Sequence, residues 1–100
     1  MREDLSQEGR KDDGAKPRYS LLPWEAVAVV VAVLEFGARK YSEGNWRHVE
    51  GGSRRYRDAA LRHVIADQRG EALDPDSGLP HLAHAACSLL FAIALDRKEG

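Results

Sequence analysis

Residues 24–41 read WEAVAVVVAVLEFGARKY, and this stretch decides the fold class. Its alternation of alanine and valine also suits a β-strand. No hairpin turn follows it, however, and the sequence offers no second strand with which it could pair. Because a lone strand is not viable, we expect a helix that starts at Pro23, where the missing N–H costs nothing. It should end near Tyr41, with Gly44 as a stop.

Two further segments are predicted to be helical. Ser53 is a candidate N-cap for a helix that reaches about Gln68 and is followed by Gly70. Pro80 opens a last helix that runs to about Asp96. Residues 71–79 between them form a turn-rich connection. The sequence therefore predicts an all-α fold, a small helical bundle of three main helices.

The first helix also carries information about assembly. Its middle stretch is apolar on every side, which requires burial by more than one neighbour. Three short helices in one chain can scarcely supply that burial. We therefore expect the bundle to be completed by oligomerisation, as a dimer or a tetramer.

Length and composition limit the number of domains and exclude several classes of function. One hundred residues make about one domain, and we expect a flexible N-terminal arm at 1–18 and a helical domain at 19–97. A formal net charge of -1 argues against binding to duplex nucleic acid, and one cysteine excludes an internal disulfide. The N-terminus lacks the apolar core of a signal peptide, and the longest apolar run is too short for a bilayer. We expect a cytoplasmic protein without a membrane partner.

Imidazoles and carboxylates gather between positions 62 and 84. His81 and His84 share one face of the last helix, a spacing suited to one metal ion or to phosphates. The preceding loop delivers acidic residues to the start of that helix, and hard oxygen ligands favour Mg²⁺ or Mn²⁺. The alternative is a turn whose aspartates cap the helix and whose imidazoles are structural. The candidate metal ligands are Glu35, His63, Asp67, Glu71, Asp74, His81 and His84.

Three of these candidates depend on how the helices face one another. Four residues of the second helix fall on one stripe of a helical wheel: Tyr56, Ala60, His63 and Asp67. Glu35 interrupts an apolar run, and a buried carboxylate needs a partner or a metal. Glu35 could therefore face the same cavity as His63 and Asp67, or it could face solvent.

A basic group beside two aromatic residues is a candidate for binding a phosphorylated ligand. Basic side chains hold phosphates, and Tyr41 or Trp46 could stack on a base. The alternative is that Trp46 belongs to the core and the arginines form a solvated rim. The candidate substrate-binding residues are Lys40, Asn45, Trp46, Arg47 and Arg62.

Several known chemistries are excluded by missing motifs. No histidine is followed directly by aspartate, and the sequence contains neither a Walker loop nor a Rossmann glycine pattern. His48-Val49-Glu50 begins like a zinc deaminase signature, but the Pro-Cys-x-x-Cys that completes it is missing.

The motifs LEFGARKY (34–41), GNWR (44–47), ALRH (60–63) and SGLPHLAHA (77–85) together resemble a phage-enriched helical family. That family is named for dATP/dGTP diphosphohydrolase activity and is similar to the MazG-like all-α nucleotide pyrophosphohydrolases. The resemblance covers residues 16–92, and the combined order and spacing of the motifs are specific. It implies hydrolysis of a purine deoxynucleoside or nucleoside triphosphate to the monophosphate and pyrophosphate, adjusting the nucleotide pool in phage infection.

The resemblance also implies a divalent cation, Mg²⁺ or Mn²⁺, with Glu35, Glu71 and Asp74 as the catalytic candidates. This chain departs from the glutamate-rich MazG-like motifs, because Glu35 is the one obvious glutamate of its first helix, and His81 and His84 stand in place of the second motif. The alternative function is that of a non-catalytic phage protein that binds a nucleotide or a host factor.

Overall fold

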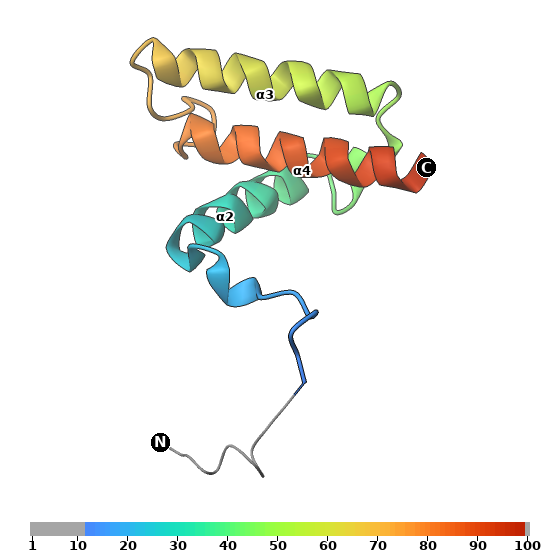
Figure 1. Ribbon diagram of the computed structural model, residues 1–100. Helices are drawn as coiled ribbons and strands as arrows, with labels where there is room; N and C mark the ends of the chain where they lie inside the picture. Colours follow the sequence, from blue (N-terminus) through green and yellow to red (C-terminus); the bar gives the residue numbers. More distant parts are fainter. Residues whose placement is uncertain (1–11, 100) are drawn as a thin grey trace.

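The computed structural model describes residues 12–99, with side chains described as far as residue 97. This range contains three α-helices, α2 (Trp24–Lys40), α3 (Gly52–Gln68) and α4 (His81–Glu99) (Figure 1). Two short 3-10 helices, η1 (Tyr19–Leu21) and η2 (Asn45–His48), precede α2 and α3. The described residues form no strand beyond one isolated bridge between Leu73 and Pro80. The all-α prediction is confirmed, and most of the predicted arm, residues 1–11, lies outside the described range.

The last helix is the centre of the molecule. Figure 1 shows α3 and α4 side by side as an antiparallel hairpin, with α2 packed against α4. Apart from His81 at its start, the buried positions of α4 carry small side chains, which let both neighbouring helices approach its backbone closely. They are Ala83, Ala85, Cys87, Ser88 and Ala92.

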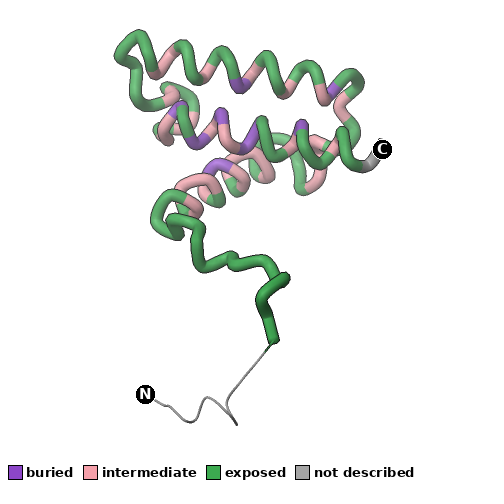
Figure 2. The backbone as a smooth tube through the Cα atoms, viewed as in Figure 1, coloured by how far each residue is buried: buried purple, intermediate pink, exposed green. Residues whose placement is uncertain are grey.

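The hydrophobic core of the single chain is thin. Val33 of α2 packs against Ala83 and Cys87 of α4, and the Cys87 thiol lies 3.4 Å from the Val30 carbonyl oxygen. Buried positions follow the contact lines of α4, while most of the other described surface is exposed (Figure 2). No large side chain is completely buried within the described residues. Nor does any described helix combine the length and apolarity needed to cross a membrane.

The start of α3 differs from the prediction. Ser53 does not cap the helix, because the chain enters it through Gly51 in a left-handed conformation at φ +67°. The Ser53 hydroxyl instead donates a hydrogen bond of 2.6 Å to Asp96 at the far end of α4. Gly52 lies so close to α4 that a Cβ there would stand 2.9 Å from Leu95 Cδ1. Close approach of the two helices, rather than a side-chain cap, sets this boundary.

Candidate functional site

The loop between α3 and α4 places two acidic side chains of the site, Glu71 and Asp74. Gly70, at φ +100°, ends α3 with backbone hydrogen bonds of 3.0 Å from Gly70 to Asp67 and from Glu71 to Ala66. The loop closes on itself where Asp74 N–H donates to the Leu79 carbonyl at 2.8 Å. Glu71 and Asp74 are thereby held beside the first turn of α4.

Two imidazoles and one carboxylate meet where this loop touches the helices. His63 Nδ1 from α3 lies 2.8 Å from His81 Nδ1, at the start of α4. Asp74 Oδ2 lies 3.9 Å from each of these nitrogens. We refer to His63, Asp74 and His81 as the imidazole–carboxylate cluster; its donor atoms all lie within 4.8 Å of one another, as a metal site requires.

Hydrogen bonds fix the direction of two members of the cluster. Asp74 Oδ1 accepts backbone N–H groups from Asp76 at 2.8 Å and from Ser77 at 3.0 Å, which leaves Oδ2 toward the imidazoles. Glu71 Oε1 lies 2.7 Å from His81 Nε2, on the side of the ring away from the cluster. Since a carboxylate only accepts, His81 Nε2 carries the proton and donates it.

His84 adjoins the cluster without belonging to it. Its ring stacks on His63, with 4.7 Å between centroids and an interplanar angle of 19°. Its Nε2 lies 2.7 Å from the Ser77 hydroxyl oxygen, and Phe36 of α2 meets the ring edge to face. His84 therefore connects the cluster to α2.

Burial sets the charge state of these groups. Burial lowers the pKa values of His63 and His84, so both imidazoles are neutral at pH 7 and each keeps one unprotonated ring nitrogen. Burial alone would raise the pKa of Asp74, but hydrogen bonds from the Ser77 and Asp76 backbones and the nearby His84 and His63 lower it overall. Neutral imidazoles beside an ionised carboxylate form a donor set for a cation.

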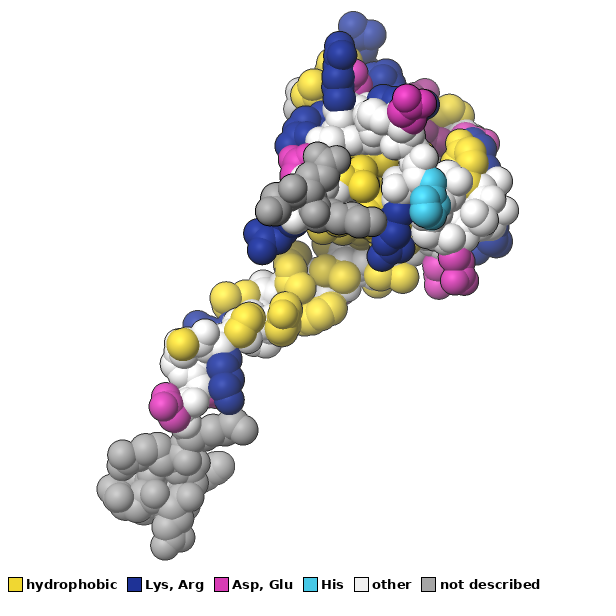
Figure 3. Space-filling model, turned by 90° about the vertical axis from the view of Figure 1, so that its right-hand side faces the viewer, with side chains coloured by type: hydrophobic (Ala, Val, Ile, Leu, Met, Phe, Trp, Pro, Cys, Tyr) yellow, Lys and Arg dark blue, Asp and Glu magenta, His cyan; other side chains and the backbone are white. Residues whose placement is uncertain are grey.

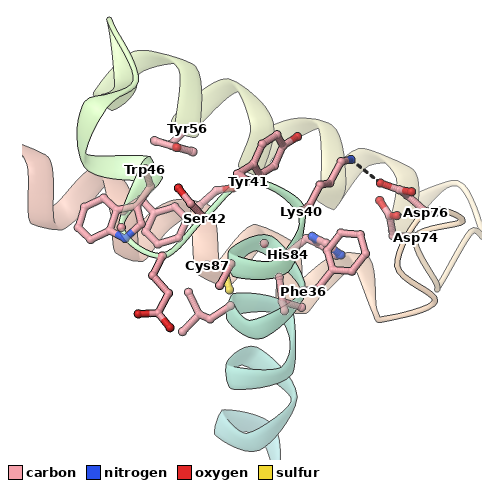
Figure 4. Close-up of a pocket in the computed structure, with 18 of the residues that line it drawn as sticks. Phe36, Lys40, Tyr41, Ser42, Trp46, Tyr56, Asp74, Asp76, His84 and Cys87 are labelled. Atoms are coloured by element: carbon pink, nitrogen blue, oxygen red, sulfur yellow. Dashed lines mark hydrogen bonds and ion pairs between the residues drawn. The ribbon is translucent and has the colours of Figure 1, made fainter.

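A cavity of about 420 Å³ opens beside the cluster, and its walls come from all three helices and the loops between them. Figure 4 shows Phe36 and Lys40 of α2 and Tyr41 just after it, with His84 beside Phe36 and with Asp74 and Asp76 next to Lys40. Lys40 Nζ lies 2.6 Å from Asp76 Oδ2, drawn as a dashed line. This hydrogen bond raises the pKa of Lys40, which keeps the ammonium charged at the rim of the cavity.

The far end of the same cavity is aromatic. Trp46 stacks on Phe91 of α4 at 4.7 Å and 10°, and the Arg47 guanidinium lies 4.4 Å from the Trp46 ring centroid. Tyr56 of α3 meets Phe91 at 5.0 Å. Trp46 is thus first a packing residue, and Tyr41, which is exposed and lines the cavity, has the freer ring.

The predicted metal ligands separate into three groups. His63, Asp74 and His81 form the cluster, while Glu71 and His84 contact its members from outside. Asp67 is half-buried on α3 but outside the cluster. Glu35 is exposed on α2 and is not among the cavity-lining residues, so its expected place beside His63 is not found within the chain.

The predicted substrate-binding residues are also divided. Lys40 and Trp46 line the cavity, whereas Asn45 and Arg62 do not. Arg47 lines a second hollow at the start of α3. Two residues went unrecognised in the sequence: Phe36, and Ser77 as the partner of His84. The Asp-x-x-Ser spacing of residues 74–77 is the signal of a side-chain-capped turn that would have drawn attention to Ser77.

Comparisons with known proteins identify a matching family model and a phage relative. The family model described as dATP/dGTP diphosphohydrolase, N-terminal, matches residues 6–100. The dATP/dGTP diphosphohydrolase of Salmonella phage PMBT28 is 36% identical over 83 residues, which cover 83% of this chain and 28% of that relative. The chain therefore corresponds to little more than a quarter of the relative's length, and no solved structure matches it. The chain belongs to the family of N-terminal domains of dATP/dGTP diphosphohydrolases.

Proposed function

We propose that this chain hydrolyses purine deoxynucleoside triphosphates between the α- and β-phosphates, with the aid of a divalent cation, Mg²⁺ or Mn²⁺. The supporting observation is one cavity lined by two members of the imidazole–carboxylate cluster, His63 and Asp74, together with a charged lysine and an aromatic wall. Its volume falls within the range of about 300–1,000 Å³ usual for small-molecule sites. The phage relative's name supplies the substrate class, and the expected place of action is the cytoplasm of an infected host.

Each part of the cavity has a role in this reaction. Hydrolysis adds one water across the bridge between the α- and β-phosphates, so the water oxygen bonds to phosphorus and the bridging oxygen leaves with the other product. Lys40 would exchange Asp76 for a phosphate oxygen, and the neutral His84 would accept the proton that the water loses. A divalent ion held by the cluster would neutralise phosphate charge and acidify the attacking water. Tyr41 and Phe36 offer rings for the purine.

The test is a product assay. The purified chain is incubated with dGTP, dATP, dCTP or dTTP and Mn²⁺, and nucleotides and pyrophosphate are quantified by ion-exchange chromatography. We expect deoxynucleoside monophosphate and pyrophosphate in equal amounts from the purine substrates. Asp74→Asn should remove the activity, whereas Asp58→Asn, at an exposed position of α3, should retain it. A chain that turns over no nucleotide with any divalent ion would refute the proposal.

A second candidate is a nucleotide-binding module without catalysis. It is favoured by the coverage, because the match spans 28% of the phage relative and its remaining length could carry the chemistry. Isothermal titration calorimetry separates the two candidates. Binding of dGTP by a chain that yields no product selects the binding module.

We further propose that the chain forms a homo-oligomer, a dimer or a tetramer. Trp24 and Val31 of α2 are 54% and 43% exposed, and Leu90 and Ile93 of α4 are 51% and 55% exposed. Figure 3 shows hydrophobic side chains gathered on the surface of α2 that leads away from the hairpin. Helices with such faces are usually covered by a further element, and a second copy of the chain supplies one.

Light scattering after gel filtration tests this assembly. We expect a molar mass that is two or four times that of one chain, and Val31→Asp should shift it to the monomer. Glu25→Gln, at an exposed position in the first turn of α2, is the control and should leave the mass unchanged. A parent chain that elutes as a monomer at all concentrations would contradict self-association.

A further inference from the structure

The donor atoms of the cluster identify the kind of ion it takes. Two of the three are imidazole nitrogens and one is a carboxylate oxygen. We propose that His63, Asp74 and His81 bind a first-row transition-metal ion, such as Mn²⁺, Co²⁺ or Zn²⁺, in preference to Mg²⁺. The inference sharpens the proposed function, on which its catalytic meaning rests, by naming the ion and its three ligands.

The spacing of the three atoms matches metal–ligand bond lengths. Their separations are 2.8, 3.9 and 3.9 Å. Three points so placed lie on a circle of radius about 2.1 Å, and bonds from zinc to imidazole nitrogen or carboxylate oxygen measure about 2.0–2.2 Å. An ion near the centre of this circle reaches all three atoms without movement of the backbone.

The chemistry of the donors selects among divalent ions. Mg²⁺ keeps several water ligands and prefers carboxylate and phosphate oxygens, so a pair of imidazoles is a poor site for it. Imidazole nitrogen suits zinc, copper, iron and nickel, and affinity for a given site generally rises along the series from manganese toward copper. Two imidazoles and one carboxylate therefore favour a transition metal.

The hydrogen bond from His81 to Glu71 prepares one of these nitrogens. Because His81 Nε2 donates to Glu71, Nδ1 is the ring nitrogen that faces the cluster and can bind an ion. His63 Nδ1 lies 2.8 Å from His81 Nδ1, a hydrogen-bond distance, so without an ion the two nitrogens share one proton. A cation that replaces this proton satisfies both rings, and Asp74 supplies negative charge beside it.

Burial separates this cluster from a chance grouping on the surface. The side chains of His81, Asp74 and His63 are 6%, 15% and 22% exposed, so little water competes for the ion. His63 and Asp74 also line the cavity that contains Lys40. Three protein ligands leave coordination positions free, as catalytic sites require, and the cavity is the place from which a phosphate oxygen could fill them.

The first experiment uses the unmutated protein, freed of metal and of any histidine tag. Its four histidine side chains are followed by ¹H–¹⁵N NMR during titration with Zn²⁺ and, separately, with Mg²⁺. We expect one equivalent of Zn²⁺ to shift the ring nitrogens of two histidines strongly, with His48 unaffected, and Mg²⁺ at the same concentration to shift none. Equal responses to both ions, or a zinc response confined to His48, would overturn the inference.

The second experiment measures affinity with matched variants. Titration with Co²⁺ is followed by visible absorption, which reports nitrogen coordination. His63→Ala and His81→Ala should each weaken Co²⁺ binding more than about 100-fold, since the loss of a ligand exceeds the effect usual for an outer hydrogen bond. His48→Ala removes the exposed histidine and should keep the parent affinity. Unchanged Co²⁺ binding in folded His63→Ala and His81→Ala, checked by circular dichroism, would contradict the ligand assignment.

The two proposals can fail independently. Tight Co²⁺ binding by a protein that hydrolyses no nucleotide would refute the activity and support the metal site. Hydrolysis supported by Mg²⁺ alone, with no Co²⁺ bound at the imidazoles, would support the activity and refute the metal site.

Discussion

The two ends of the α3–α4 hairpin both carry polar clusters that join the helices, and they differ in exposure. At the loop end, Asp74 and His81 of the imidazole–carboxylate cluster have side chains 15% and 6% exposed. At the open end, Arg57 and Asp96 form an ion pair with side chains 53% and 43% exposed, and Ser53 donates to the same carboxylate. The same pair of helices is thus joined by a buried cluster at one end and by an exposed one at the other.

The difference lies in whether the groups satisfy one another. Arg57 and Asp96 carry opposite charges and need no third partner, so this pair serves to join the helix ends. At the other end, two imidazole nitrogens that share a proton face each other at 2.8 Å, beside a carboxylate oxygen 3.9 Å from both. At 3.9 Å, Asp74 Oδ2 lies beyond hydrogen-bond distance of both nitrogens, so its negative charge is not satisfied by either imidazole and is available to a cation. We infer that the loop end is arranged for a ligand and the open end for stability.

The largest effect is expected on hydrolysis, when one residue at each end of the hairpin is substituted. His63→Ala should lower kcat/KM for dGTP about 1,000-fold, because loss of a metal ligand removes several kcal/mol of transition-state stabilisation. Asp96→Asn should leave kcat/KM near the parent value, since Asp96 lies outside the cavity. Steady-state kinetics at saturating Mn²⁺ provides the measurement. Equal losses in the two variants would mean that the hairpin ends do not differ in function.

Substitution of Glu71 tests whether its hydrogen bond orients the His81 ring for metal binding. Glu71→Ala removes the acceptor for His81 Nε2–H and should weaken metal binding about 10- to 100-fold. Glu71→Gln keeps an amide oxygen that can accept the same hydrogen bond, so its loss should be smaller. Cobalt titrations give both affinities, with Glu50→Ala, exposed and remote in sequence, as the control. A glutamine variant as weak as the alanine variant would argue against an orienting hydrogen bond.

Substitution of Gly70 tests how much the left-handed backbone at the start of the α3–α4 loop contributes to the free energy of unfolding. At φ +100° a side chain is strained, and Gly70→Ala should lower the free energy of unfolding by about 1–3 kcal/mol. Gly37 lies inside α2 with open space around it, so Gly37→Ala should raise the free energy of unfolding by about 0.5–1 kcal/mol. Urea denaturation of both variants checks the opposite signs. A stabilising Gly70→Ala would show that the left-handed turn is not required.

As the pH falls, the histidines at the loop end should lose their contribution to stability first, and Asp96 at the open end should lose its contribution at lower pH. The pKa values of His63 and His84 are lowered in the folded protein by burial, so below about pH 6.5 the unfolded chain takes up protons first. The free energy of unfolding should therefore fall between pH 7 and the lowered pKa values. Hydrogen bonds from Arg57 and Ser53 lower the pKa of Asp96, whose contribution is present above about pH 4 and is lost as the pH drops through the folded value.

Urea denaturation of the chelator-treated protein at closely spaced pH values measures both steps. Asp96→Asn should keep the loss between pH 7 and 5.5 and reduce the loss below about pH 4. A free energy of unfolding that stays constant from pH 7.5 to 5.5 would contradict the histidine contribution.

Prediction from sequence succeeded where local pattern governs and fell short where distant segments meet. The three helices and the turn glycine at position 70 follow from periodicity and capping. The grouping of His63, Asp74 and His81 was within reach because they lie on adjoining segments, 18 residues apart between the two imidazoles. The Lys40–Asp76 pair spans 36 residues, and nothing local in the sequence signals it. The exposure of Glu35 depends on how α2 crosses α4, which its own apolar neighbours do not specify.

The smallest expected effect is at the open end. Arg57→Gln removes the ion pair with Asp96, but both partners are exposed and solvent already screens their attraction. We expect unchanged hydrolysis and metal affinity, with a slight fall in the melting temperature that shrinks further in high salt. Differential scanning calorimetry at low and high salt measures this fall, with Arg62→Gln, on the exposed face of α3, as the control. A large loss of metal affinity in Arg57→Gln would mean that the two ends of the hairpin are coupled through α4, and that the open end serves the site as well as the fold.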